Sequence, residues 1–369
     1  RKESSAASDV YKRQVDPVRK VIMKVLLAGD QFVTNQVLEE ALTQKLPQVK
    51  IAKISSSWPV PPFQDVAEVK EALGDEDELI AALKGCEVAF SHTFPFTEKV
   101  ISASPDLRLI TICRGGPVNV NIEAATRHGV MVSYTPGRNA IATSEHTVGM
   151  IYAALRQIPQ RHLELVNGKW RSDYYKFENV GSELACSTVG LVGYGAVGKL
   201  VAKTLLATGA KIVVYDPWAD TADAPEELEF VDSPAQLFEV SNIVSIHARA
   251  TADNHHMVDA KMLALMPEGG IIVNCARGSL VDYDAVCDAL DSNHLYAAAF
   301  DALPLEPLPL DHRLLKTERV TLTPHLGGAS QDSARLAARI GTEDIFRFSE
   351  QKAPLHLSNP EVLAQKKKS

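Results

Sequence analysis

The chain has 369 residues, of which 46% are hydrophobic and 23% are charged, and its net charge of −8 is accompanied by an isoelectric point near 5.8. This composition is typical of a globular protein with enough apolar material for two domains. The acidic balance argues against a nucleic-acid or anionic-membrane surface, and no apolar run reaches the roughly 18 residues of a membrane-spanning helix. We therefore expect no nucleic acid and no membrane among the partners.

The five cysteines are odd in number and contain no CxxC pair. This pattern is typical of a reducing compartment and gives no zinc signature, so we expect a cytoplasmic protein without a metal site. The neighbouring His255 and His256 lack an obvious third ligand, which favours a solvated surface pair over a metal site.

The N-terminal segment has an unusual sequence. Residues 4–14, SSAASDVYKRQ, resemble the translation of a sequencing adapter. We therefore expect residues 1–22 to be adapter-derived or disordered, and we expect the genuine start to lie at Met23.

Short apolar runs alternate with segments of helical periodicity from Met23 onward. The expected strands of this first region are 24–30, 49–54, 85–92 and 107–114, and the expected helices are 35–46 and 122–129. Strands that alternate with helices indicate an α/β domain with a parallel sheet. A Thr135-Pro136-Gly137 turn and a long helix from about Ala140 then indicate the crossover into a second domain.

The second domain begins its own strand–helix–strand series at residues 187–217. Further strands are expected at 242–247, 270–275, 296–301 and 319–324. After His325 there remain one amphipathic helix, 330–348, and an extended end, which together are too short for a domain of their own. We expect this remainder to pack on the first domain.

A glycine-rich turn in this series has the spacing of a dinucleotide-binding site. Gly193, Gly195 and Gly198 form G-x-G-x-x-G between an expected strand and an expected helix, and the next strand ends in Asp216, about 20 residues further on. The first glycine allows a tight turn, the second lets backbone approach a pyrophosphate, and the third lets helix pack on strand. The helix N-terminus attracts phosphate, whereas Asp216 can accept from ribose hydroxyls and repels a 2′-phosphate. The pattern predicts NAD rather than NADP, with a purely structural glycine turn as the alternative.

Three residues at expected strand ends suit acid–base chemistry. Arg277 offers a planar cationic fork for a carboxylate, Glu306 lies in a proline-rich loop, and His325 lies between a proline and two glycines. A pair of Glu306 and His325 stabilises the imidazolium and raises its pKa, so that the histidine can donate a proton to a keto oxygen. Each residue also has a plainer interpretation, as a surface arginine, an exposed loop acid and a structural histidine.

Four motifs together carry a family resemblance. The segments NCARGSLVDYDAV (274–286), FDALPLEP (300–307) and TPHLGGAS (323–330), with the glycine turn, resemble the D-isomer-specific 2-hydroxyacid dehydrogenase family, and the likeness extends from Met23 to about Leu363. It implies an α/β protein with two Rossmann-like domains and parallel sheets. The NAD-binding domain (135–326) is expected to be inserted into a flavodoxin-like substrate domain (23–134 and 327–363).

The resemblance also implies roles for single residues. The three residues Arg277, Glu306 and His325 match the family's catalytic arginine, glutamate and histidine. The implied cofactor contacts, with Asp301 near the nicotinamide carboxamide, come from Gly193, Gly195, Val197, Gly198, Asp216, Cys275 and Asp301. The implied substrate contacts come from Thr93, Arg114, Gly115 and Gly116.

Three features depart from the family's pattern. Asn121 stands where many members have aspartate, and the segment 247–258 lacks the usual proline. Arg114 is an additional cation. It is either the partner of a nearby acid or a second anchor for an acidic substrate tail, and the sequence leaves both interpretations open.

These features predict a NAD-dependent oxidoreductase that interconverts a small D-2-hydroxy acid and its 2-keto acid. The resemblance is to 3-phosphoglycerate dehydrogenases, and it makes 3-phosphoglycerate the first candidate substrate. We expect a chain without the C-terminal regulatory domain of those enzymes. Reduction of hydroxypyruvate, glyoxylate or a sugar-derived acid is one alternative, and a NAD(H)-sensing, corepressor-like binding protein is another. Formate dehydrogenases have glutamine in place of Glu306, which argues against that activity. The resemblance further implies a homodimer formed through the cofactor domain, with the helix from Ala140 as the candidate interface.

Overall fold

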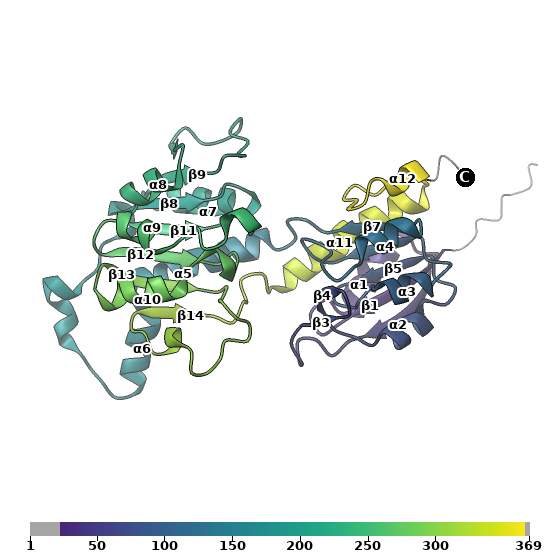
Figure 1. Ribbon diagram of the computed structural model, residues 1–369, viewed down its shortest axis with the longest axis horizontal. Coiled ribbons are helices and arrows are strands. Elements are labelled where there is room, and N and C mark those ends of the chain that lie inside the picture. Colours follow the sequence, from purple (N-terminus) through teal and green to yellow (C-terminus); the bar gives the residue numbers. More distant parts are fainter. Residues whose placement is uncertain (1–22, 366–369) are drawn as a thin grey trace, which may run out of the picture. The chain divides into compact units, whose positions relative to one another are not determined.

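The computed structural model describes residues 23–365, so the predictions for residues 1–22 lie outside the described residues. The described part of the chain divides into two compact units (Figure 1), one comprising residues 23–136 with 337–365 and the other comprising Gly137–Leu336. The sequence placed the corresponding boundaries at 134 and 326. The second of these differs because the helix that follows His325 begins in one unit and ends in the other.

The first unit is built on a five-stranded parallel sheet with the order β2-β1-β5-β6-β7. Its strands are β1 (Lys24–Gly29), β2 (Lys50–Ser55), β5 (Val88–Ser91), β6 (Leu109–Ile112) and β7 (Met131–Tyr134). The central strands β5 and β6 are buried along their whole length, as expected where helices cover both faces of a parallel sheet. The strand order is the flavodoxin-like one. A separate antiparallel pair is formed by β3 (Gln64–Val66) and β4 (Val69–Ala72).

Four helices of the first unit begin at residues that cap them. Thr34, Asp75, Thr97 and Asn121 each accept a hydrogen bond from a backbone N–H of the first turn, which satisfies a donor that the helix itself leaves unpaired. These helices are α1 (Asn35–Lys45), α2 (Glu76–Leu83), α3 (Glu98–Ser102) and α4 (Ile122–Arg127). The unit also contains most of α11 (Gln331–Ser349), which begins in the second unit, and α12 (Val362–Gln365). The extended end is fixed beside β7 because Asn359 accepts from Val132 N (2.9 Å) and donates to Val130 O (3.0 Å).

The second unit contains a seven-stranded parallel sheet with the order β10-β9-β8-β11-β12-β13-β14. The first six strands, counted along the chain, follow the Rossmann order 3-2-1-4-5-6. The strands are β8 (Thr188–Val192), β9 (Lys211–Tyr215), β10 (Leu228–Phe230), β11 (Ile243–Ile246), β12 (Gly270–Asn274), β13 (Leu295–Phe300) and β14 (Val320–Leu322). The predicted α/β class with parallel sheets is therefore confirmed.

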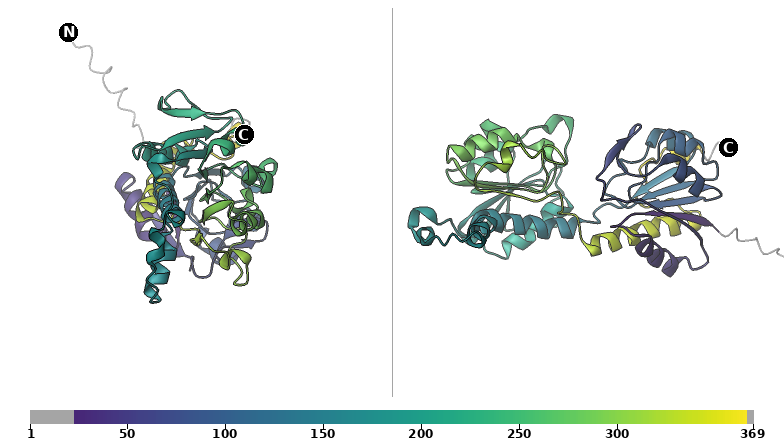
Figure 2. Two further views of the ribbon diagram at one scale, coloured as in Figure 1. Left: turned by 90° about the vertical axis from the view of Figure 1, so that its left-hand side faces the viewer. Right: turned by 90° about the horizontal axis from the view of Figure 1, so that it is seen from below.

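Helices cover this sheet on both faces, and each face has its own core (Figure 2). One core packs α5 (Ala140–Arg156) and α7 (Ala196–Leu206) against the sheet. The other packs α8 (Pro234–Val240), α9 (Ala260–Leu265) and α10 (Tyr283–Asp291). The helix α6 (Ile158–Val166) follows α5 and has no buried residue. Short 3-10 helices lie at Ser172–Tyr175, Phe177–Asn179, Leu184–Cys186, Ala252–Asn254, Gly278–Leu280 and Arg313–Leu315.

The elements predicted from hydrophobic periodicity all occur within a few residues of their expected positions. The strands β3, β4, β7 and β10 were not anticipated. They are short or lie directly before a turn, so they present too few alternating residues to be recognised. No helix within the described residues is both long and apolar enough to cross a membrane.

Two glycines within helices should respond in opposite ways to alanine. A Cβ at Gly341 of α11 would lie 2.4 Å from the Phe90 ring, whereas a Cβ at Gly149 of α5 would meet nothing within 4 Å. We expect Gly341→Ala to destabilise the first unit by about 1–3 kcal/mol through overpacking. Gly149→Ala is the matched control and should stabilise by up to about 1 kcal/mol through helix propensity. Urea unfolding measures both, and equal midpoints for the two variants would contradict the packing argument.

Candidate active site

In the glycine turn between β8 and α7, close packing of the backbone requires glycine at two of the three glycine positions. Gly193 has a φ of +104°, and a Cβ there would lie 2.8 Å from the backbone N of Ala248. A Cβ at Gly198 would lie 2.2 Å from Gly193 O. Gly195 is different, because a Cβ there would meet nothing within 4 Å, and no side chain caps the N-terminus of α7 that it begins. An open backbone at an uncapped helix N-terminus fits a pyrophosphate.

Asp216 follows β9 and lies beside this turn. Its carboxylate accepts from Tyr194 N (2.7 Å) and from Trp218 N (2.9 Å). These bonds fix the Asp216 carboxylate beside Tyr194, the residue after Gly193. The carboxylate can accept further hydrogen bonds there, such as those from ribose hydroxyls. Lys199 is the cation nearest to the turn in sequence, and its ammonium is directed at Asp220 O (3.4 Å).

The segment 247–258, which departs from the family's pattern, forms an ordered loop. Thr251 and Asn254 form a capping box around a 3-10 turn, and the Asn254 side chain donates to Arg249 O (2.7 Å). His247 at its start donates its backbone N–H to Val192 O (2.7 Å). Burial lowers the pKa of His247 to about 4, so its ring is neutral at physiological pH. The loop is therefore held to the glycine turn without the expected proline.

His325 and Glu306 are in direct contact. His325 Nδ1 lies 2.6 Å from Glu306 Oε2, and the other carboxylate oxygen of Glu306 accepts from Leu303 N (3.0 Å). The hydrogen bond that His325 donates to Glu306 raises the pKa of His325 against the opposing effects of burial and of Arg277. Burial by itself raises the pKa of Glu306, but the bonds from His325 and Leu303 outweigh it and lower that pKa. The pair therefore favours imidazolium beside carboxylate, the arrangement of a proton donor with its pKa-setting partner.

Asp301 holds the loop that carries His325. Its buried carboxylate accepts from Thr323 Oγ1 (2.6 Å), Leu326 N (2.7 Å) and Gly327 N (2.8 Å), and it lies 3.4 Å from His146 Nε2. Burial raises the pKa of Asp301, but hydrogen bonds led by the one from His146 outweigh it and lower the pKa to about 2. Asp301 is therefore ionised at physiological pH, and its bonds are directed at the loop.

Arg277 begins the turn after β12. Its guanidinium donates to Ala276 O (2.7 Å), and its charge lowers the pKa of Glu306 and opposes the rise at His325. The buried side chain of Asn274 fixes the turn by donating to Arg277 O (2.8 Å) and accepting from Ala276 N (2.9 Å). Arg277 is exposed, so its guanidinium is accessible to an anionic ligand.

The two remaining expected cofactor residues differ in accessibility. Val197 lies half-buried in the first turn of α7. Cys275 is buried, and burial raises the pKa of its thiol to about 12. The thiol is therefore protonated and serves as a small apolar surface rather than as a nucleophile.

The expected substrate residues lie in the first unit and are described there by themselves. Gly115 and Gly116 have open surroundings, because a Cβ at either would meet nothing within 4 Å. Thr93 is buried, and its hydroxyl lies 3.0 Å from Ser56 Oγ. Arg114 forms an ion pair with Glu71 and lies 4.7 Å from the centre of the Phe63 ring. Of the two interpretations left open for Arg114, the structure shows the partnership with a nearby acid.

Asparagines organise the loop around these residues. Asn119 donates to His92 O (3.3 Å) and Phe94 O (2.8 Å) and thereby holds the loop on either side of Thr93. Asn121 caps α4 by accepting from Ala124 N (2.9 Å). Asparagine and aspartate are equally good N-caps, which explains why Asn121 can replace the usual aspartate.

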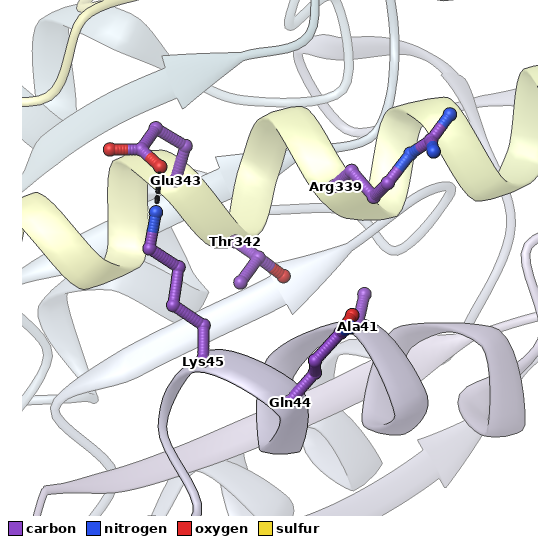
Figure 3. Close-up of a pocket in the computed structure, with 6 residues that line it drawn as sticks. All are labelled: Ala41, Gln44, Lys45, Arg339, Thr342 and Glu343. Carbon is purple, nitrogen blue, oxygen red and sulfur yellow. Dashed lines mark hydrogen bonds and ion pairs between the residues drawn. The ribbon is translucent and has the colours of Figure 1, made fainter.

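A surface hollow of about 330 Å³ in the first unit lies apart from every predicted site residue. It lies between α1 and α11, where Lys45 and Glu343 point toward one another and form an ion pair (Figure 3). Its lining residues are Ala41, Gln44, Lys45, Arg339, Thr342 and Glu343. The hollow contains none of the acid–base chemistry described above, so we do not assign the active site to it.

Sequence reasoning missed several polar residues that hold the candidate loops of each unit. The buried ones are Asn119 in the first unit and Asn274 and Tyr283 in the second, and the half-buried His146 contacts Asp301 in the second. Asn274 and Tyr283 lie inside a quoted motif, and an asparagine at the end of an apolar strand was the available signal. Nothing in the sequence marks His146, which lies on α5 far from His325 along the chain.

A Rossmann unit with an open glycine turn, together with an arginine and a glutamate–histidine pair at neighbouring strand ends, defines a nicotinamide-dependent oxidoreductase. Comparison with known proteins supports this class of enzyme. Residues 148–327 match the model of the D-isomer specific 2-hydroxyacid dehydrogenase family, NAD binding domain.

The chain is similar to curated enzymes and to a solved structure. It is 30% identical over 324 residues to the glyoxylate reductase of Korarchaeum cryptofilum, covering 87% of this chain and 96% of that protein. It is 34% identical over 286 residues to the D-3-phosphoglycerate dehydrogenase of Methanocaldococcus jannaschii, covering 77% of this chain but only 54% of that protein. The structure of D-2-hydroxyisocaproate dehydrogenase has the same fold, with a TM-score of 0.77 at 22% identity over 91% of this chain and 100% of that one.

The chain therefore belongs to the D-isomer-specific 2-hydroxyacid dehydrogenase family of NAD-dependent oxidoreductases, and the predicted family and cofactor are confirmed. It spans about half the length of the phosphoglycerate dehydrogenase that it matches.

Replacing the carboxylate of Glu306 should lower the pKa of His325. In Glu306→Gln the raising effect of the carboxylate is lost while burial and Arg277, which both lower that pKa, remain. Histidine NMR titration measures the change directly. The control is Glu318→Gln, which removes the same charge from an exposed residue and should leave the midpoint unchanged. An unaltered midpoint in Glu306→Gln would show that the pair does not set the protonation of His325.

Proposed function

We propose that the protein interconverts a small D-2-hydroxy acid and its 2-keto acid, with His325 as acid–base residue, Glu306 as its pKa-setting partner and Arg277 as the anchor of the substrate carboxylate. The observation that carries this proposal is the 2.6 Å contact between His325 Nδ1 and Glu306 Oε2. It leaves Nε2 as the nitrogen that can exchange a proton with substrate. When bound, NADH supplies the hydride for the keto carbon.

The proton transfer follows from the raised pKa of His325. In the direction of reduction, imidazolium donates the proton from Nε2 to the keto oxygen, and Glu306 stabilises the imidazolium beforehand. In the direction of oxidation, neutral imidazole accepts the hydroxyl proton. The raised pKa keeps the donor form populated to higher pH, which favours reduction near neutrality.

The proposed binding of the cofactor uses the chain's own backbone and one carboxylate. Gly195 and the N-terminus of α7 provide N–H groups for the pyrophosphate, and Val197 lies on the same turn. Asp216 can accept from ribose hydroxyls and repels a 2′-phosphate, which supports NAD over NADP. Asp301 contributes by holding the loop of His325, and Cys275 contributes a neutral surface.

We favour an unphosphorylated substrate such as glyoxylate or hydroxypyruvate over 3-phosphoglycerate. Gly115 and Gly116 can bind a carboxylate through open backbone N–H groups, while Thr93 helps to hold the loop beside them. Arg114, the additional cation that could have read a phosphate, is paired with Glu71. One relative of which the chain covers 96% is a glyoxylate reductase.

We also propose that the protein is a cytoplasmic homodimer. The five cysteines are free thiols, which supports a reducing compartment. The segment that begins with α6 projects from the second unit (Figure 1) and exposes large apolar side chains. Trp170, Tyr175 and Phe177 are 83%, 94% and 93% exposed. The family resemblance implies a homodimer with the helix from Ala140 as the candidate interface, and this segment directly follows that helix. We propose that a second copy of the chain covers its exposed apolar side chains.

A substrate panel tests the proposed activity. NADH oxidation should be fastest with glyoxylate or hydroxypyruvate and slower with 3-phosphohydroxypyruvate, because Arg114, the additional cation beside the substrate loop, is paired with Glu71. His325→Gln should lower turnover by about two to four orders of magnitude while NADH binding, followed by fluorescence, remains near that of the wild type. NADH binding without turnover of any 2-keto acid would instead support a dinucleotide-sensing protein.

Polar substitutions in the projecting segment test the dimer. Trp170→Ser combined with Phe177→Ser should convert a dimer into a monomer in size-exclusion chromatography with light scattering, because the apolar contact area is lost. Trp218→Ser is the control, since Trp218 is 88% exposed and lies outside that segment. A wild-type protein that is monomeric at all concentrations would refute the dimer.

A further inference from the structure

Tyr283 at the start of α10 makes two hydrogen bonds from a buried position. Its hydroxyl donates to Ala302 O (2.6 Å) and accepts from Asn274 Nδ2 (3.2 Å), and the side chain is only 5% exposed. Asn274 is fully buried, and the same amide also donates to Arg277 O (2.8 Å). The tyrosine thus connects the turn of Arg277 to the loop after β13.

The Ala302–Leu303 peptide lies between Tyr283 and Glu306. Its carbonyl oxygen accepts from Tyr283 (2.6 Å), and its N–H donates to Glu306 Oε1 (3.0 Å). A peptide unit is planar and rigid, so a bond that fixes one end also orients the other. A hydrogen bond to the carbonyl also polarises the unit and strengthens its N–H as a donor.

Other contacts keep this peptide against the Arg277 turn. Asn274 O accepts from Asp301 N (3.0 Å) and Ala302 N (3.3 Å). A Cβ at Gly278 would lie 1.9 Å from Leu303 O, so the turn and the loop are as close as their backbones allow. Among the contacts described here, the Tyr283 hydroxyl is the side-chain donor to the carbonyl of this peptide.

We propose that Tyr283 is a positioning residue for the proton-transfer pair, because its hydroxyl orients the Ala302–Leu303 peptide whose N–H holds the Glu306 carboxylate toward His325. Tyr283 itself touches neither His325 nor substrate. This inference rests on the proposed function of the Glu306–His325 pair. It adds Tyr283 as a residue that determines the orientation of the Glu306 carboxylate.

Tyr283→Phe removes the hydroxyl and keeps the ring, which packs against Phe300 with ring centroids 4.9 Å apart. We expect kcat to fall by roughly tenfold to a hundredfold, since small misplacements of catalytic groups have effects of this size. The NADH dissociation constant should stay close to that of the wild type, because Tyr283 is not part of the glycine turn. The pH midpoint of the alkaline limb of kcat/KM for reduction should move to lower pH, because a carboxylate that is free to turn holds the imidazolium less well.

The matched control is Ser241→Ala. Ser241 is fully buried in the same unit, and its hydroxyl donates to Leu237 O (2.6 Å). Ser241→Ala therefore also removes a hydrogen bond from a buried hydroxyl to a backbone carbonyl. We expect both variants to lose similar stability, but only Tyr283→Phe to shift the midpoint. An unchanged or raised midpoint in Tyr283→Phe, or an equal shift in both variants, would overturn the proposal.

Histidine NMR separates this inference from the proposed function. The resonance of His325, assigned by its loss in His325→Gln, should titrate at lower pH in Tyr283→Phe whether or not a substrate has been found. If His325→Gln abolishes turnover and Tyr283→Phe leaves the titration unchanged, the function stands and the inference fails. If the titration shifts but no 2-keto acid is reduced, the inference stands and the proposed reaction fails.

Discussion

The position of His325 depends on the buried carboxylate of Asp301. His325 has a φ of +55°, a left-handed conformation that costs roughly 1–2 kcal/mol in a non-glycine residue. Asp301 compensates by accepting from the two N–H groups that follow, those of Leu326 and Gly327, while its own carbonyl accepts from His325 N (3.0 Å). Because the pKa of Asp301 is about 2, these bonds persist across the pH range in which His325 titrates. Asp301 therefore stays charged and keeps the loop in place while His325 gains or loses its proton.

Strand register explains why residues distant in sequence meet at this loop. Asn274 at the end of β12 is paired with Phe300 of β13, and Phe300 is paired with Leu322 of β14. Since the strands are parallel, the residues that follow all emerge at the same edge of the sheet. Arg277, Glu306 and His325 lie a few residues beyond these three positions, and the hydrogen bonds of Asn274, Tyr283 and Asp301 determine the remaining geometry.

The fold class and the candidate residues could be predicted from the sequence. The hydrogen-bond partners that hold those residues in place could not. Apolar runs and glycine spacing are local signals, so the strands and the cofactor turn could be predicted from them. The contact of Tyr283 with Ala302 depends on register between β12 and β13, which no local pattern reveals. Likewise, the sequence could not show whether Arg114 pairs with an acid or anchors a substrate tail. Its partner Glu71 is close to it only in the folded chain. Asp301 was expected near the cofactor, and only the coordinates show that its oxygens are directed at the loop of His325.

The glycines of the candidate site divide into those that the fold requires and those that it does not. Gly193 and Gly198 are explained by the chain, because a side chain at either would collide with backbone. Gly195 and the Gly115–Gly116 pair are not, since a Cβ at each would meet nothing within 4 Å, and none of the three has a positive φ. A residue with a side chain would fit these positions in the free protein and would lower the conformational entropy of the unfolded chain. We propose that bound molecules account for these three glycines, a pyrophosphate at Gly195 and a substrate carboxylate at Gly115 and Gly116.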